Sequence, residues 1–114
     1  MSQVSVCVVG LGAHGVLEVG QFLRSPDRWA IAGVVDTSIA SYMRFKATYP
    51  GIQVPYFRQL SEALDALEPD VTLISTHAPS HVPIAKEVIG HGLSKFVLIE
   101  KPISNSVAVA ESLI

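Results

Sequence analysis

Short apolar runs alternate along this chain with longer stretches in which apolar residues recur at helical spacing. The apolar runs are rich in β-branched residues, which favours strands. One run contains Pro55, which has no N–H for a sheet ladder, so we place that strand at an edge. The pattern predicts strands at Val4–Val9, Trp29–Val35, Ile52–Phe57, Val71–Ser75 and Lys95–Ile99.

Helices are predicted between these strands because apolar residues return there every three or four positions. Ser61 is expected to cap one helix, and Gly90-His91-Gly92 is expected to end another. The predicted helices are Ala13–Arg24, Ser38–Thr48, Glu62–Leu67 and Pro79–Gly90, with a last one beginning near Ser104. The residues expected to face the core are Val16, Leu17, Gly20 and Leu23 in the first helix and Val82, Ala85, Val88 and Ile89 in the fourth.

Continuous apolar strands that alternate with amphipathic helices are typical of a parallel sheet covered by helices on both faces. Right-handed crossovers leave few topologies for such a chain. We therefore predict an α/β fold with a doubly wound parallel sheet of the Rossmann type, in the strand order 3-2-1-4-5. The 114 residues suffice for one domain, and residues 1–114 contain no internal repeat or linker.

The composition supports a buried core and excludes several classes of function. Hydrophobic residues make up 49% of the chain and charged residues 16%, which argues against disorder. A net charge of -2 gives no reason to expect a nucleic acid or an anionic membrane as a partner. The single cysteine, Cys7, excludes an internal disulfide framework and is expected to be buried. Because no secretory signal, membrane-spanning segment or metal-ligand spacing of histidines is visible, we expect a soluble cytoplasmic protein without a metal.

The most informative local motif is the glycine turn Gly10-Leu11-Gly12-Ala13-His14-Gly15, which closes the first strand and opens the first helix. In that context the pattern is typical of a turn that binds the diphosphate of a dinucleotide. Gly10 permits the tight turn, Gly12 lets a diphosphate approach the backbone, and Gly15 lets helix and strand pack closely. The helix N-terminus adds N–H donors and a partial positive charge. The alternative is a purely structural glycine turn in another α/β protein.

Asp36 directly follows the second apolar run and lies about 20 residues beyond the glycine turn, where dinucleotide-binding domains carry an acidic residue that binds the ribose hydroxyls. A carboxylate there repels a 2′-phosphate, so NAD is favoured over NADP as the cofactor. Thr37, next to Asp36, is a further candidate for cofactor binding. Alternatively, Asp36 caps the following helix. Arg44, Lys46 and His91 are expected to face solvent.

Two further polar strand ends, Ser75-Thr76-His77 and Glu100-Lys101-Pro102, border the same predicted crevice. Together with the glycine turn, Val34-Val35-Asp36 and His81, they resemble the N-terminal NAD-binding domain of the glucose–fructose oxidoreductase/inositol dehydrogenase (Gfo/Idh/MocA) family. The resemblance covers the chain from Val4 to about Ile114, and Glu-Lys-Pro is its most specific part. It implies an oxidoreductase that transfers hydride between a nicotinamide cofactor and a sugar, an inositol or a similar small molecule.

The resemblance also implies roles for single residues. Glu100 and Lys101 would border the nicotinamide ribose and the substrate, with Lys101 as the catalytic residue that polarises the reacting oxygen. His81 would lie near the cofactor, and the alternative is a histidine that touches only water or backbone. The family's usual Thr-Pro-Asn is replaced here by Thr76-His77-Ala78, which makes His77 a candidate for the nicotinamide side.

The second domain of the family, which supplies most substrate contacts, is absent from these 114 residues. We therefore expect either an excised cofactor domain or a stand-alone half. Its apolar end, Val107–Ala110 and Leu113-Ile114, would need a second domain or an oligomer partner for cover. The alternative to an enzyme is a non-catalytic, regulatory dinucleotide-binding module or a half-enzyme completed by a partner. A CoA- or nucleotide-binding module is a weaker rival, because Asp36 suits a dinucleotide better.

Overall fold

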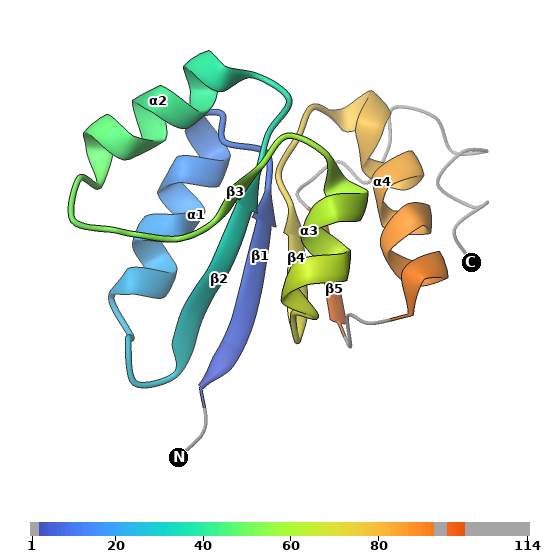
Figure 1. Ribbon diagram of the computed structural model, residues 1–114, viewed down its shortest axis with the longest axis horizontal. Helices are drawn as coiled ribbons and strands as arrows, with labels where there is room; N and C mark the ends of the chain where they lie inside the picture. Colours follow the sequence, from blue (N-terminus) through green and yellow to red (C-terminus); the bar gives the residue numbers. More distant parts are fainter. Residues whose placement is uncertain (1–2, 93–95, 100–114) are drawn as a thin grey trace.

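The structure of the chain, a computed structural model, describes residues 3–92 and 96–99. Strands and helices alternate along this part of the chain (Figure 1). The strands are β1 (Val4–Val9), β2 (Trp29–Val35), β3 (Tyr56–Phe57), β4 (Val71–Ile74) and β5 (Phe96–Ile99), and the helices are α1 (Ala13–Leu23), α2 (Ile39–Thr48), α3 (Leu60–Leu67) and α4 (Ala78–His91). The predicted helix near Ser104 and the segment Glu100-Lys101-Pro102 lie outside the described residues.

The described strands form one parallel sheet in the order β3-β2-β1-β4-β5, which confirms the predicted topology. Helices α1 and α2 cover one face of the sheet, and α3 and α4 cover the other (Figure 1). Parallel pairing brings the carboxyl ends of β1, β2 and β4 to the same edge of the sheet. The connections that follow these strands therefore meet at one place, where open α/β sheets bind their ligands.

The central strand β1 contributes to two layers of the core. Val6 and Val8 belong to the cluster that includes residues of α1 and α2, while Cys7 and Val9 belong to the cluster beside α3. All of these side chains are buried. Burial raises the pKa of the Cys7 thiol to about 12, so the thiol stays protonated at neutral pH and is not a nucleophile.

The predicted inner face of α1 is correct at Val16, which packs against the core, but not at two of the other predicted residues. Gly15 and Val19 are the buried residues of this helix, whereas Leu17 is 64% exposed and Leu23 is 38% exposed. The physical reason lies at Gly15, where a Cβ would stand 1.9 Å from the Gly10 carbonyl oxygen. Because the helix approaches the turn through this bare position, it directs part of the predicted apolar face toward solvent.

The predicted inner face of α4 is correct except at its last residue. Val82, Ala85 and Val88 are buried, but Ile89 is 57% exposed. Neighbouring positions on a helix point about 100° apart, so Val88 and Ile89 cannot both face the same narrow contact.

The ends of several elements correct the sequence-based boundaries. Ser38 caps α2, because its hydroxyl accepts a hydrogen bond from the Ser41 N–H at 3.2 Å. Ser61 does not cap α3; Gln59 occupies that position without a side-chain cap bond. Strand β3 lies at the predicted edge but is limited to two residues, since Pro55 offers only its carbonyl, to the Val34 N–H at 3.0 Å.

His91 does not simply face solvent as predicted. Its Nε2 lies 2.7 Å from Asp65 Oδ1, and its side chain is 22% exposed. The pair links the end of α4 to α3. None of the helices within the described ranges is long and apolar enough to cross a membrane.

Candidate functional site

The turn between β1 and α1 depends on Gly10. Its φ of 102° lies in a region that residues with a side chain rarely adopt. A Cβ at this position would also stand 2.6 Å from the Ser75 carbonyl oxygen. The Gly10 N–H donates to the Val35 carbonyl at 2.8 Å, which fixes the turn against the end of β2. The turn therefore packs between β2 and β4 at a distance that only glycine permits.

The other two glycines of the turn differ in what surrounds them. A Cβ at Gly15 would collide with the Gly10 carbonyl, whereas a Cβ at Gly12 would meet no atom within 4 Å. Gly12 is the N-cap of α1, and no side chain caps this helix. The first N–H groups of α1 are thus left for a ligand, and the surface above Gly12 is open for one.

Asp36 joins the end of β2 to the glycine turn. Its Oδ2 accepts a hydrogen bond from the Leu11 N–H at 2.8 Å, and its Oδ1 accepts one from the Ser38 N–H at 2.7 Å. An ionised carboxylate can accept about four hydrogen bonds, so acceptor positions remain for other donors. The two hydrogen bonds hold the Asp36 carboxylate in one orientation beside the glycine turn.

The turn between β4 and α4 is held by side-chain hydrogen bonds. Ser80 Oγ donates to the His77 carbonyl at 2.7 Å and lies 2.6 Å from Thr76 Oγ1. His81 Nε2 donates to the Thr76 carbonyl, which places the ring proton on that nitrogen. His77 is the N-cap of α4, and its exposed ring makes no cap bond.

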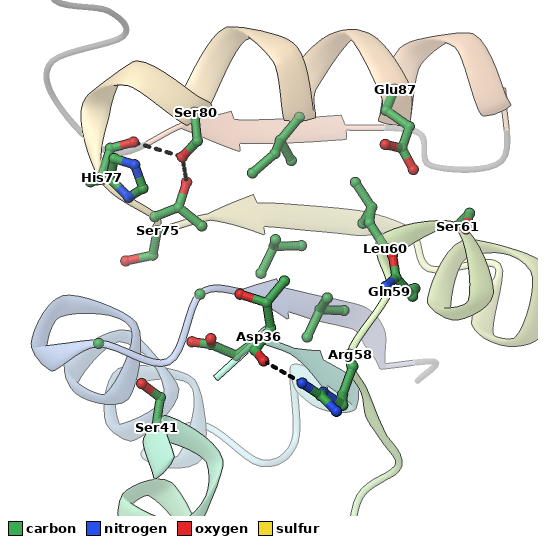
Figure 2. A pocket seen from close by; sticks show the side chains of 17 residues that line it. Asp36, Ser41, Arg58, Gln59, Leu60, Ser61, Ser75, His77, Ser80 and Glu87 are labelled. Atoms are coloured by element: carbon green, nitrogen blue, oxygen red, sulfur yellow. Dashed lines mark hydrogen bonds between the residues drawn. The ribbon is translucent and has the colours of Figure 1, made fainter. Parts of the chain in front are cut away.

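These three turns border one cleft of about 530 Å³ (Figure 2). Of the predicted site residues, the cleft is lined by Gly10, Gly12, Asp36, Thr37, Ser75, Thr76 and His77. Leu11, Ala13, His14, Gly15 and His81 do not line it. His81 is 1% exposed and supports the Thr76 backbone, so a contact with a cofactor stays a prediction for this residue. Glu100 and Lys101 lie outside the described residues.

The hydroxyl of Ser75 tests whether the cleft fits a polar ligand. Ser75 is 7% exposed and lines the cleft, yet its Oγ has no hydrogen-bond partner within the described part of the chain. Buried hydroxyls are nearly always hydrogen-bonded, either to protein or to a bound molecule. An orphaned donor at the end of β4, an open surface above Gly12 and an uncapped α1 together fit a dinucleotide that crosses the edge of the sheet.

One part of the cleft was not anticipated from the sequence. It is formed by the end of β3, the start of α3 and one face of α4, and its residues are Arg58, Gln59, Leu60, Ser61, Ile84 and Glu87. The helical period continues from Ser80 to Ile84 and Glu87, so counting along α4 would have identified that half. Nothing in the local sequence marks the α3 half, because its place depends on how α3 and α4 pack.

Three basic residues that follow Asp36 in the sequence each donate a hydrogen bond to a different acceptor. Arg58 Nη2 donates to the Thr37 carbonyl at 3.3 Å (Figure 2). Arg44 Nη2 donates to Ser41 Oγ at 3.1 Å, and Lys46 Nζ donates to the Ile52 carbonyl at 2.5 Å. Arg44 is exposed, as expected, whereas Lys46 is directed onto the loop before β3. Only Arg58 of these three lines the cleft.

No group of three His, Cys, Asp or Glu residues within 3–92 and 96–99 is arranged to hold a metal ion. The polar groups that line the cleft in this part of the chain are hydroxyls, the carboxylates of Asp36 and Glu87, the imidazole of His77, the side-chain amide of Gln59 and the guanidinium of Arg58.

The sheet is parallel and doubly wound, and its first turn exposes the backbone at Gly12. The Asp36 carboxylate lies beside this turn at the end of the next strand. These features define a Rossmann-type dinucleotide-binding domain. Residues 4–114 match the family described as GFO_IDH_MocA, an oxidoreductase family with an NAD-binding Rossmann fold. The chain belongs to this family, which confirms the resemblance and, at the level of the family, NAD as the cofactor of the domain.

Solved structures agree with this assignment. GenD2 from gentamicin A biosynthesis, crystallised with NAD, has a TM-score of 0.83 and 28% identity over 99% of this chain and 31% of its own. The WlbA dehydrogenase from Bordetella pertussis, crystallised with NADH and UDP-GlcNAcA, has a TM-score of 0.87 and 21% identity over 98% of this chain and 33% of its own. The scyllo-inositol dehydrogenase from Lactobacillus casei, with bound NAD(H) and scyllo-inositol, has a TM-score of 0.83 and 18% identity, over 98% of this chain and 32% of its own. The last two similarities show the fold alone.

The chain thus spans about a third of the length of these structural neighbours. A comparison of the sequence with curated proteins found no match.

Proposed function

We propose that this chain is the cofactor domain of an NAD-dependent oxidoreductase that transfers hydride to or from a sugar, an inositol or a similar small hydroxyl or carbonyl substrate. The observation that carries the proposal is the hydrogen bond of 2.8 Å between Asp36 Oδ2 and the Leu11 N–H. This bond holds the Asp36 carboxylate, which would bind the ribose hydroxyls, beside the glycine turn, which would bind the diphosphate. The ribose and the diphosphate of one adenosine diphosphate group could therefore be bound next to each other.

Each described part of the cleft has a binding task in this proposal. The diphosphate lies above Gly12, where the uncapped N–H groups of α1 donate to its oxygens. Asp36 accepts hydrogen bonds from the adenosine ribose hydroxyls and repels a 2′-phosphate. Ser75, Thr76 and His77 line the side toward β4, where the Ser75 hydroxyl gains a partner. The bound dinucleotide supplies the hydride chemistry, and the chain binds and orients it.

The substrate class and the assembly are inferred from the structural neighbours. The neighbours were crystallised with NAD, with NADH and UDP-GlcNAcA, or with NAD(H) and scyllo-inositol, which supports a sugar-like substrate. Because this chain spans about a third of their length, the proposal includes a second domain or an oligomer partner that supplies substrate contacts. It also includes a cytoplasmic location and, because the net charge is -2, no nucleic-acid partner.

Calorimetric titration of the purified chain with NAD and with NADP tests the cofactor assignment. We expect NAD to bind, and to bind at least about tenfold more tightly than NADP, because the Asp36 carboxylate would face a 2′-phosphate of like charge. Clear preference for NADP, or no binding of either dinucleotide, would contradict the proposal.

Lys101 is the proposed catalytic residue, by resemblance. In a chain that includes the second domain, Lys101→Ala is expected to lower kcat by about 100-fold or more and to change the Kd for NAD little, because the cation polarises the reacting oxygen. Steady-state kinetics and NAD titration of the same variant separate these quantities. A loss of NAD affinity at unchanged kcat would make Lys101 a cofactor anchor. Absence of turnover in the unmodified chain with its partner domain would favour a regulatory module.

A further inference from the structure

The backbone of Asp36 is held on both sides of its Cα by β3. The Tyr56 hydroxyl donates a hydrogen bond to the Asp36 carbonyl oxygen at 2.9 Å. The Asp36 N–H donates to the Phe57 carbonyl at 3.1 Å. These two groups belong to the two planar peptide units that flank the Cα, and the orientation of those units determines the direction of the Cα–Cβ bond. The contacts with β3 therefore determine where the Asp36 carboxylate points.

The sheet alone does not supply this hold. The pairing of β2 with β3 ends at Val35 and Phe57, one residue before Asp36. The Tyr56 hydroxyl offers the Asp36 carbonyl a donor just beyond the last residue pair, at a point where a backbone carbonyl needs a partner. A side chain thus extends the grip of β3 to the one residue of this connection that carries the carboxylate.

The position of the Tyr56 hydroxyl is itself fixed by packing. The ring of Tyr56 stacks on the ring of Tyr42 from α2, with ring centroids 4.0 Å apart and planes inclined by 5°. Both rings are half-buried and pack against the buried cluster that contains Val34 and Phe45. Because a phenol hydroxyl lies at the end of a rigid ring, the stack that holds the ring also holds the oxygen.

Helix α2 closes this set of contacts on Asp36. The Asp36 Oδ1 accepts the hydrogen bond from the Ser38 N–H at 2.7 Å, and Ser38 is the N-cap of α2. The same helix carries Tyr42, which stacks on Tyr56, and Tyr56 returns to the Asp36 carbonyl. The carboxylate cannot turn away without breaking one of these contacts.

From this arrangement we infer that Tyr56 is a positioning residue that holds the Asp36 carboxylate toward the ribose and thereby maintains the preference for NAD over NADP. The inference rests on the proposed function, which places the adenosine ribose at Asp36. Tyr56 does not line the cleft, so it acts through Asp36 rather than on the dinucleotide. A carboxylate that is free to turn gives weaker hydrogen bonds to the ribose hydroxyls of NAD and less repulsion toward a 2′-phosphate.

The experiment titrates NAD and NADP calorimetrically into the 114-residue chain and into Tyr56→Phe, which keeps the ring and removes only the hydroxyl. We expect the Kd for NAD to rise about fivefold, the effect of one hydrogen bond, and the Kd for NADP to change by less than about twofold. The ratio of the two affinities should therefore fall about fivefold.

Tyr49→Phe is the matched control. The Tyr49 hydroxyl also donates to a backbone carbonyl at 2.9 Å, but its acceptor is Val16 of α1, and the ring packs against the same buried cluster. This substitution costs a comparable hydrogen bond without touching Asp36. It should leave the ratio of NAD to NADP affinity unchanged, so the ratio distinguishes positioning of Asp36 from a general loss of stability.

A double-mutant cycle tests whether Tyr56 acts through Asp36. In an Asp36→Asn background the carboxylate is already gone, so adding Tyr56→Phe should leave the ratio of NAD to NADP affinity unchanged. Conversely, 4-aminophenylalanine at position 56 carries an amine that still donates to the Asp36 carbonyl. This replacement should restore the ratio to that of the unmodified chain.

The outcomes separate this inference from the proposed function. The role of Tyr56 is overturned by an unchanged ratio in Tyr56→Phe, by an equal fall in Tyr49→Phe, or by an undiminished effect in the Asp36→Asn background. Failure of the unmodified chain to bind NAD, or its preference for NADP, contradicts the proposed function instead. Circular dichroism of each variant checks the fold. If Tyr56→Phe were unfolded, 4-fluorophenylalanine at position 56, which fills the ring position but donates no hydrogen bond, would decide by the same ratio.

Discussion

Gly12→Ala is expected to weaken NAD binding by about 100-fold or more while the free energy of unfolding of the chain stays within about 1 kcal/mol of its original value. A Cβ at Gly12 meets no atom within 4 Å, and the backbone there, at φ -73° and ψ -171°, is open to any residue. Alanine restricts the unfolded chain but is a poorer N-cap than glycine, and these small effects oppose each other. The methyl group would instead occupy the space where a diphosphate approaches the N–H groups of α1.

Gly15→Ala provides the matched comparison, because this substitution is expected to lower the stability of the chain, which Gly12→Ala leaves nearly unchanged. Its Cβ would stand 1.9 Å from the Gly10 carbonyl oxygen, which is backbone and cannot move aside as a flexible side chain would. We expect a loss of stability of about 3 kcal/mol, the size typical of overpacking in a tight core. Urea denaturation measures stability, and calorimetric titration measures NAD affinity. If Gly12→Ala bound NAD like the unmodified chain, the diphosphate would have to lie elsewhere.

The pattern of the strands could be predicted well because it is a property of short sequence segments. Each strand of a parallel sheet covered on both faces is apolar along its whole length, and β1 at Val4–Val9 and β2 at Trp29–Val35 are bounded as predicted. The helices were less predictable, since apolar residues alone do not tell which side touches the sheet. In α1 the contact is made through Gly15, a position that carries no hydrophobic signal.

One part of the candidate site could likewise be predicted from the sequence, and another part could not. The glycine turn and Asp36 could be found from the sequence because the spacing between a turn and the end of the next strand is fixed by one strand–helix–strand unit. The part of the cleft at Leu60 and Ile84 could not be found from the sequence, because it exists only where α3 and α4 pack side by side over the core. The dual role of Asp36 was likewise open: its carboxylate binds both the Leu11 N–H of the glycine turn and the Ser38 N–H before α2.

Asp36→Asn is expected to weaken NAD binding by about 10- to 100-fold, the effect of losing charged hydrogen bonds to the ribose hydroxyls. It should also destabilise the chain by about 1–2 kcal/mol, because an asparagine amide offers one oxygen where the carboxylate now accepts from two N–H groups. The same change removes the like charge beside a 2′-phosphate, and Arg58, which donates to the neighbouring Thr37 carbonyl, stays in the cleft. NADP should therefore bind at least as tightly as NAD.

The switch of preference distinguishes an electrostatic role of Asp36 from a purely structural one. A carboxylate that only supported the turn would, when replaced, weaken NAD and NADP by the same factor and leave their ratio unchanged. Asp27→Asn removes the same charge from an exposed turn outside the cleft and serves as the control for net charge. Raising the salt concentration should reduce the preference of the unmodified chain for NAD, since repulsion between partly exposed charges is screened. A preference that neither salt nor Asp36→Asn altered would show that the cofactor is selected by shape rather than by this carboxylate.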